Sequence, residues 1–220
     1  MSELFSIQLQ NRQQQGRDGV WLDLPTTTEQ VQAALRQIGI SSDNPQGLFI
    51  SGYFAEEEKR FAIPYNIVLA SNVDELNFLA SRLETLSTGE RAELNAALQA
   101  PQSELFSIRR ITDFPENVDY YVHLPDVHGP AQLGDYYLNR SGMVDMPEEW
   151  KGGIDTAQFG RYVAQQEQGV FTEYGYLVKS GDAWQKVHEG QPVPEEYRVL
   201  SFPAPEVLRD SANILSLIHI

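Results

Sequence analysis

The feature that most constrains this chain is the stretch from Asp113 to Asp155, which combines dense negative charge with many apolar residues. It holds nine acids and only two bases, Arg140 and Lys151. An acidic segment without apolar residues would stay disordered, because it could not bury enough surface to offset the loss of chain entropy. Here the carboxylates are interspersed with residues able to form a core: Tyr120, Tyr121, Val122, Leu124, Leu133, Tyr136, Tyr137, Leu138 and Trp150. The sequence therefore predicts a folded scaffold that holds carboxylates in fixed positions.

The whole chain shares this acidic character. Its 220 residues include 31 acids and 16 bases, which gives a formal charge of −15. Such a charge argues against direct binding to nucleic acid phosphates or anionic lipid, and it favours either a basic partner or simple solubility. The hydrophobic fraction of 41% is sufficient for a packed core. Because cysteine is absent, disulfides, thiolate metal sites and cysteine catalysis are excluded.

The N-terminal sequence carries no apolar segment typical of a signal peptide. No run of residues approaches the roughly 18 apolar positions that a membrane span requires. We therefore expect a cytoplasmic protein. The apolar tail 215–220 has no helix cap or stop signal, and we assign it no function.

Hydrophobic periodicity predicts an α+β chain. In the first part, strands are expected over 3–9, 20–24 and 48–54, the last with a possible bulge at Gly52. A helix is expected between the second and third strands, capped by a threonine of 26–28 and ended by Gly39. The middle of the chain predicts a helical hairpin, with Asn72 or Asp74 capping its first helix and Thr88 its second. The remaining elements are expected as a short helix at 146–150, a helix over 156–168, a strand over 169–178, a turn at 180–182 before 184–187, and a strand over 197–202.

Two short sequences occur twice. Residues 2–7 (SELFSI) recur as 103–108, and 21–25 (WLDLP) resembles 121–125 (YVHLP). We therefore expect an elongated chain of small domains, in which two related strand–strand–helix–strand units flank a helical middle domain. The expected boundaries are 1–61 for an N-terminal α+β domain, 62–103 for the helical domain, 104–178 for an acidic α+β domain, and 179–220 for an extension with a β-hairpin and a tail.

Motifs for enzymatic chemistry are weak. The turn containing His123, Asp126 and His128 could hold a metal, which makes a metal-dependent enzyme a remote alternative. Adjacent glutamates, as at 148–149, lack the contrasting environments that separate the pKa values of catalytic carboxylates. Phosphate-binding glycine motifs and nucleophile motifs are absent from the sequence. We expect neither enzymatic activity nor a cofactor or bound metal.

The remaining candidate site is a distributed acidic surface that would bind a basic partner. Its carboxylates would compete for the lysine and arginine side chains that a DNA-binding protein directs at phosphates. An interaction or adaptor protein with a different basic partner is the alternative. The candidate residues are Glu56, Glu57, Glu58, Asp74, Glu75, Asp113, Glu116, Asp119, Asp126, Asp135, Asp145, Glu148, Glu149 and Asp155.

Several motifs, taken in order, resemble the ArdA antirestriction proteins. They are WLDLP at 21–25 before a helix ending in IGI at 38–40, FISGY at 49–53 followed by acids, NI at 66–67, DELNFLA at 74–80, GR at 160–161, and GVFTEYGY at 169–176. The resemblance covers roughly residues 3–178. It implies an elongated homodimer of three small domains. It also implies a DNA mimic that occupies the DNA-binding groove of type I restriction–modification enzymes and so protects incoming mobile DNA. Because the family has no catalytic residues, the resemblance implies none in this chain.

Overall fold

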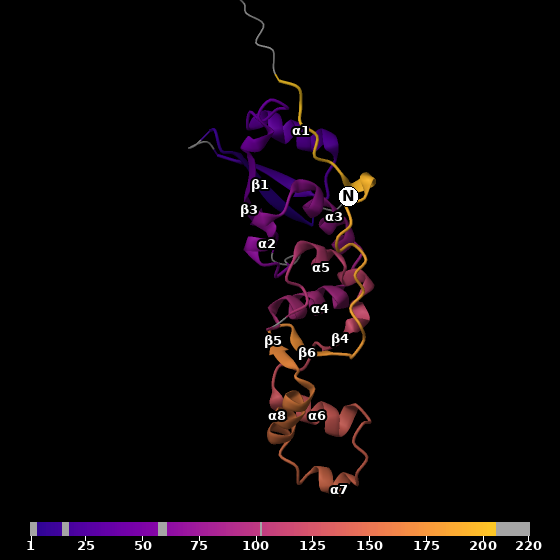
Figure 1. Ribbon diagram of the computed structural model, residues 1–220. Helices are drawn as coiled ribbons and strands as arrows, with labels where there is room; N and C mark the ends of the chain where they lie inside the picture. Colours follow the sequence, from indigo (N-terminus) through magenta and orange to yellow (C-terminus); the bar gives the residue numbers. More distant parts are fainter. Residues whose placement is uncertain (1–3, 15–17, 57–60, 102, 206–220) are drawn as a thin grey trace, which may run out of the picture.

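The computed structural model describes residues 4–14, 18–56, 61–101 and 103–205. Over these residues the chain is α+β, with eight α-helices and two antiparallel three-stranded sheets, which confirms the predicted fold class. The elements follow one another along an elongated molecule, with the first sheet toward one end and a group of helices at the other (Figure 1). Among the helices of the described residues, none combines the length and the apolar character of a membrane span.

The first sheet contains β1 (Phe5–Asn11), β2 (Val20–Leu24) and β3 (Leu48–Phe54) in the order β2-β1-β3. Alternate residues of β1 are buried, because successive side chains of a strand point to opposite faces. Between β1 and β3 the register shifts, so that Gln8 pairs with Gly52 and Leu9 with Ile50. The extra residue in β3 confirms the irregularity that the sequence predicted at this position.

The helix expected after the second strand is α1 (Thr28–Gln37), and it packs on this sheet. The side chain of Thr27 accepts from the backbone of Gln30, and the side chain of Gln30 bonds back to Thr27, forming a capping box. Gly39 follows the helix with φ +67°, a backbone conformation that costs glycine little. The short helix η1 (Pro45–Gly47) then leads into β3.

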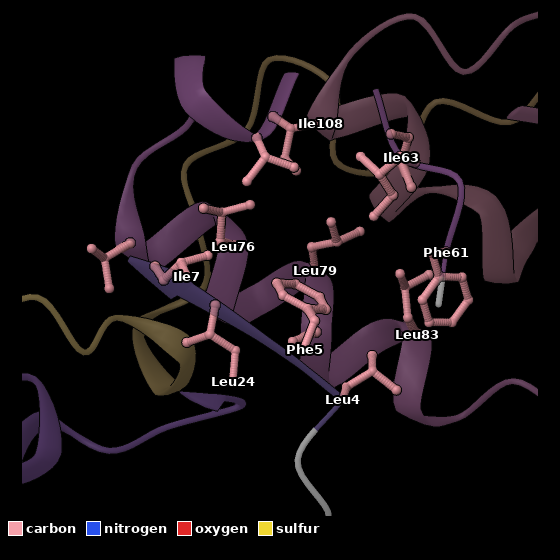
Figure 2. Packing of buried hydrophobic residues seen from close by; sticks show 14 of the residues in the cluster. Leu4, Phe5, Ile7, Leu24, Phe61, Ile63, Leu76, Leu79, Leu83 and Ile108 are labelled. Atoms are coloured by element: carbon pink, nitrogen blue, oxygen red, sulfur yellow. The ribbon is translucent and has the colours of Figure 1, made fainter. Parts of the chain in front are cut away.

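The middle of the chain is helical, with α2 (Tyr65–Ala70), α3 (Val73–Glu84) and α4 (Thr88–Gln99). Asn72 caps α3, as predicted. The cap of α4 is Ser87 rather than Thr88, because Ser87 is the extended residue whose hydroxyl reaches the Glu90 N–H. Figure 2 shows Phe5 and Ile7 of β1 lying against Leu76 and Leu79 of α3, so the first sheet and the middle helices share one core.

The predicted repeat is only partly reflected in the structure. Whereas 5–7 lie in β1, the matching 106–108 lie at the start of α5 (Ile108–Thr112). The Ser107 side chain accepts from the Arg110 N–H and begins a helix that buries Ile108 and Ile111. The second unit therefore lacks the first strand that the repeat implied, although its 121–124 does form a strand, like 21–24. No observation tests the domain boundaries, which stay predictions.

The second sheet contains β4 (Tyr121–Leu124), β5 (Val170–Thr172) and β6 (Gly175–Lys179) in the order β4-β6-β5. The single strand expected over 169–178 is instead a hairpin, β5–β6. Gly175 has φ +117°, and the Thr172 Oγ1 donates to the Gly175 carbonyl across the turn. Other elements of this part are η3 (Phe114–Glu116), η4 (Val118–Tyr120), α6 (Pro130–Asp135), the π-helix η5 (Tyr136–Arg140), α7 (Glu148–Lys151) and α8 (Thr156–Glu167).

After β6 the chain runs back along one side of the molecule toward α1 (Figure 1). The strands and β-hairpin expected at 184–187 and 197–202 do not form; η6 (Glu195–Tyr197) is the helical turn in this part. The segment is extended, but its backbone is hydrogen-bonded largely by side chains of the body rather than by a neighbouring strand. This arrangement explains how a strand-like sequence pattern occurs outside a sheet.

Candidate acidic interaction surface

The helices at the far end of the molecule form what we call the distal lobe, residues 125–169. Its centre is the crossing of α6 and α8, where two glycines bring the backbones into contact. A Cβ at Gly160 would lie 1.8 Å from the Pro130 carbonyl oxygen, and one at Gly134 would lie 1.9 Å from the Thr156 oxygen. Since real Cβ atoms do not approach so closely, the crossing requires glycine at both positions.

A half-buried carboxylate joins the lobe to the second sheet. Glu167 of α8 accepts from Tyr137 Oη at 2.5 Å and from Tyr176 Oη at 3.0 Å. Burial, followed by the hydrogen bond to Glu167, raises the pKa of both tyrosines well above the ordinary value. Tyr176 packs with Val127 and Leu133 in the small core of this region. Glu167 thus links the lobe to β6, and its carboxylate is engaged by two tyrosine hydroxyls.

Several predicted acids lie on the surface of this part of the molecule. Asp126, Asp145 and Glu149 are exposed, as is Asp119 beside the second sheet. Asp155 is also exposed, and its Oδ1 caps α8 by accepting from the N–H groups of residues 157 and 158. An anion at this position interacts favourably with the helix dipole, so Asp155 has a structural role besides its charge.

Two other predicted acids of the lobe are paired with bases. Asp135 lies 3.2 Å from Arg140 and also accepts from Asn139, while Glu148 lies 2.7 Å from Lys151. Ion pairs at such exposed positions stabilise weakly, but they reduce the local negative charge. The remaining charge of the lobe therefore comes mainly from the exposed acids without these partners.

Predicted acids nearer the middle of the molecule are engaged in the fold. Asp113 was expected on the surface but is fully buried, where its Oδ1 accepts from the His188 N–H at 2.7 Å. Burial raises the pKa of Asp113. Asp74 accepts from two backbone N–H groups of the returning segment. Glu75 pairs with Arg109, and Glu116 with Arg82.

Of the three consecutive glutamates predicted near the first sheet, only Glu56 lies within the described residues. Glu56 is exposed just after β3. Glu57 and Glu58 lie outside the described residues, so their predicted role stays a prediction.

The residues considered for a metal are not brought together. His123 Nε2 lies 2.7 Å from the Tyr174 carbonyl oxygen, whereas His128 and Asp126 are exposed. Across the described parts of the chain, no three histidine, aspartate or glutamate side chains are placed to hold a metal ion. The geometry therefore does not support the metal-dependent alternative.

One carboxylate has an unusual environment that the sequence did not predict. Glu93 on α4 is partly buried, and one of its oxygens has no hydrogen-bond partner among the described atoms. Burial, with Glu90 and Asp119 nearby, raises its pKa from 4.5 to about 8. The neighbouring Glu90 is visible in the sequence, but the approach of Asp119 and the burial depend on tertiary packing.

This environment predicts a pH-dependent stability. Between the ordinary pKa of 4.5 and the folded-state value of about 8, the unfolded chain has lost the Glu93 proton while the folded chain retains it. Stability therefore falls as pH rises through this window. After allowance for solvent screening, Glu93→Gln is expected to raise the free energy of unfolding by about 1–2 kcal/mol at pH 9 relative to pH 4. Thermal unfolding at a series of pH values would measure this.

The matched control for that experiment is Glu84→Gln, which alters an exposed carboxylate of α3. It should leave a pH profile parallel to that of the unaltered protein. A Glu93→Gln profile that is also parallel would contradict the assigned environment.

Comparison with known proteins identifies the family of this chain. The family model of the antirestriction protein ArdA matches residues 15–178, well over half of the chain. No individual curated protein matched the chain. The matched range begins after β1 and includes β2, β3, the middle helices and the distal lobe. It ends within β6, before the returning segment. The chain therefore belongs to the ArdA family of antirestriction proteins, which act against restriction–modification.

Proposed function

We propose that this protein is a DNA mimic that inhibits type I restriction–modification enzymes by occupying their DNA-binding groove. The observation that carries the proposal is the placement of exposed carboxylates on an elongated, strongly acidic molecule. They occur near the first sheet at Asp43 and Glu56, beside the second sheet at Asp119, and in the distal lobe at Asp145 and Glu149. The proposal assigns no catalytic residue and no cofactor.

Several of the basic residues are paired with acids within the fold. Because acids outnumber bases 31 to 16 over the whole chain, the electrostatic field around the molecule is negative. The described bases in ion pairs are Arg82, Arg109, Arg110, Arg140, Lys151, Lys179 and Lys186. Glu104 shows the effect: the hydrogen bond from Lys179 is the largest cause lowering its pKa, and Arg110 contributes too.

A folded protein cannot reproduce the charge density of DNA, which carries one charge per about 1.7 Å of helix axis. It does not need to, because a phosphate-binding groove presents lysine and arginine side chains that tolerate some variation in position. Carboxylates held by helices and strands would accept hydrogen bonds from those side chains. Complementary charge would also speed the encounter of the two proteins.

The test is competition for a type I methyltransferase core. Labelled duplex DNA bound to that core should be displaced by near-stoichiometric amounts of this protein. Raising the salt concentration from 50 to 200 mM should weaken inhibitor binding by about tenfold or more, because screening acts on charges held near a surface. Fluorescence anisotropy of the labelled DNA would follow both effects.

Failure to displace DNA at low salt, by a protein shown to be folded, would contradict the proposal and point to another basic partner. Displacement that is insensitive to salt would argue for an apolar interface instead. We also propose that the active form is a homodimer, and sedimentation equilibrium would test this.

A further inference from the structure

The segment 180–205, which we call the strap, lies beyond the range that the family model matches. We propose that the strap ties the second sheet to the first and so fixes the angle between the two ends of the elongated molecule. This geometric role is independent of the proposed function. Its consequence, that the strap sets the spacing of the exposed carboxylates presented to a restriction enzyme, rests on that function.

The strap is first attached beside the second sheet. The Ser180 N–H donates to the Tyr120 carbonyl oxygen at 2.9 Å. Asn117 then bonds both backbone groups of Gln185: its Oδ1 accepts from the N–H at 2.7 Å, and its Nδ2 donates to the carbonyl at 3.0 Å. The ring of Trp184 packs edge-on against Tyr120, 5.1 Å between centroids. This end of the strap is therefore held by both polar and aromatic contacts.

The second attachment crosses α5 and the adjoining turn. The buried Asp113 accepts from the His188 N–H at 2.7 Å, and the His188 ring packs against Phe78 of α3 at 4.9 Å. Arg110 lies 3.3 Å from Glu189. Arg109 also bonds the carbonyl oxygen of residue 191. The strap contacts both α3 and α5 here. It therefore bridges the junction between the middle helices and α5.

The third attachment reaches the first sheet and its helix. Asn77 donates to the Tyr197 carbonyl oxygen at 3.0 Å and accepts from the Thr26 N–H at 2.8 Å. One amide therefore joins α3, the strap and the segment between β2 and α1. Asp74 Oδ1 accepts from the N–H groups of Val199 and Leu200, each at 2.7 Å.

Two further hydrogen bonds lie beyond this point. Gln32 of α1 bonds Ser201 at 3.1 Å, and the Ser42 N–H donates to the Pro203 carbonyl at 2.9 Å. The strap thus reaches the α1 end of the molecule.

These contacts explain three polar side chains that would otherwise be out of place in a core. Asn77, Asp113 and Asn117 are 3%, 0% and 4% exposed. Buried polar groups require hydrogen-bond partners, and the strap backbone supplies one to each. An extended segment outside a sheet likewise needs side-chain partners for its own N–H and C=O groups. The polar side chains of the body and the backbone groups of the strap therefore satisfy one another at each of the three attachments. Between these attachments the strap spans the helices that separate the two sheets.

The inference can be tested by measuring the distance between the two ends. The chain contains no cysteine, so spin labels can be placed at Gln46→Cys in η1 and Ala131→Cys in α6, both exposed sites. Dipolar spectroscopy should give one narrow distance distribution in the otherwise unaltered protein. Tyr197 also packs its ring against Phe78, 4.7 Å between centroids. In Trp184→Ala/Tyr197→Ala, which removes this contact and that of Trp184 with Tyr120, the distribution should widen by about twofold, because the ends gain freedom to move.

The matched control is Val187→Ala, which shortens an exposed apolar side chain of the strap and should leave the distribution unchanged. A second pair of variants distinguishes the loss of a strap contact from general misfolding. Asp74→Ala removes the acceptor for two strap N–H groups, whereas Asp74→Asn keeps an oxygen there and should retain the narrow distribution. An unchanged distribution in both Asp74→Ala and the aromatic double variant would overturn the inference.

The same variants should be assayed for DNA displacement. A wider distribution with weaker displacement supports both the tie and its consequence for inhibition. A wider distribution with unchanged displacement overturns that consequence and leaves the tie in place. Failure of the unaltered protein to displace DNA would instead contradict the proposed function, without affecting the distance result.

Discussion

Neutralising four exposed carboxylates together is expected to weaken inhibition of a type I methyltransferase by about 30-fold. The set is Asp119→Asn, Asp126→Asn, Asp145→Asn and Glu149→Gln, which are exposed and have no ion-pair partner among the described residues. If each contributes about 0.5 kcal/mol to binding, the total is about 2 kcal/mol. The same variant should show a shallower salt dependence, because fewer charges are involved. Competition titrations at two salt concentrations would measure both quantities.

The control keeps the charge and alters only side-chain length, by exchanging aspartate and glutamate at the same four positions. It should inhibit within about threefold of the unaltered protein, since exposed charges tolerate small displacements. Glu148→Gln/Glu149→Gln should also have a small effect, because Glu148 is already paired with Lys151. Loss of all inhibition from one substitution would indicate a localised site rather than a distributed surface.

The second large effect is expected from Gly160→Ala, which changes no charge. The new Cβ would lie 1.8 Å from the Pro130 oxygen and 2.8 Å from the Gly134 nitrogen, both backbone atoms. Because backbone cannot move aside as a flexible side chain can, α6 and α8 must separate. We expect a loss of about 3 kcal/mol in the free energy of unfolding, at the upper end of overpacking effects. In a chain of this size, that lowers the melting temperature by about 6–12 °C.

The matched control is Gly152→Ala in the same lobe. Its φ of −63° suits any residue, and no atom lies within 4 Å of the added Cβ. Hydrogen exchange should show faster exchange in α6 and α8 of Gly160→Ala and no such change in the control. Inhibition should also fall in Gly160→Ala, because the acids of the distal lobe lose their fixed positions. An unchanged melting temperature would refute the close crossing.

Local features of the fold were predictable because they depend on neighbours in sequence. The hydroxyl or amide at Thr27 and Asn72, followed three residues later by Gln30 and Glu75, identifies two helix starts. Gly39 was predicted to end α1 for the same kind of reason: the left-handed backbone there costs glycine little. The strands of the first sheet also followed from alternation of apolar residues.

Features that depend on distant segments were predicted less well. The sequence SELFSI folds differently in its two copies, because Phe5 and Ile7 lie in a strand paired on both sides, whereas Ser107 caps a helix. The pattern at 197–202 is typical of a strand, yet its N–H groups at 199 and 200 find Asp74 rather than another strand. Propensity gives way to tertiary contacts in both cases.

The properties of the candidate surface can likewise be separated into those set by sequence and those set by tertiary structure. The sequence by itself determined the net charge, the acidic and aromatic character of 113–155, and the family to which the chain belongs. Only the tertiary structure decided which carboxylates remain at the surface. Asp113 is buried beneath the strap, whose His188 lies 75 positions later in the chain. Glu167 was enclosed by two tyrosines, whereas Asp126 and Glu149 stayed exposed. The physical reason is that charge is a property of composition, whereas burial depends on which distant segments pack together.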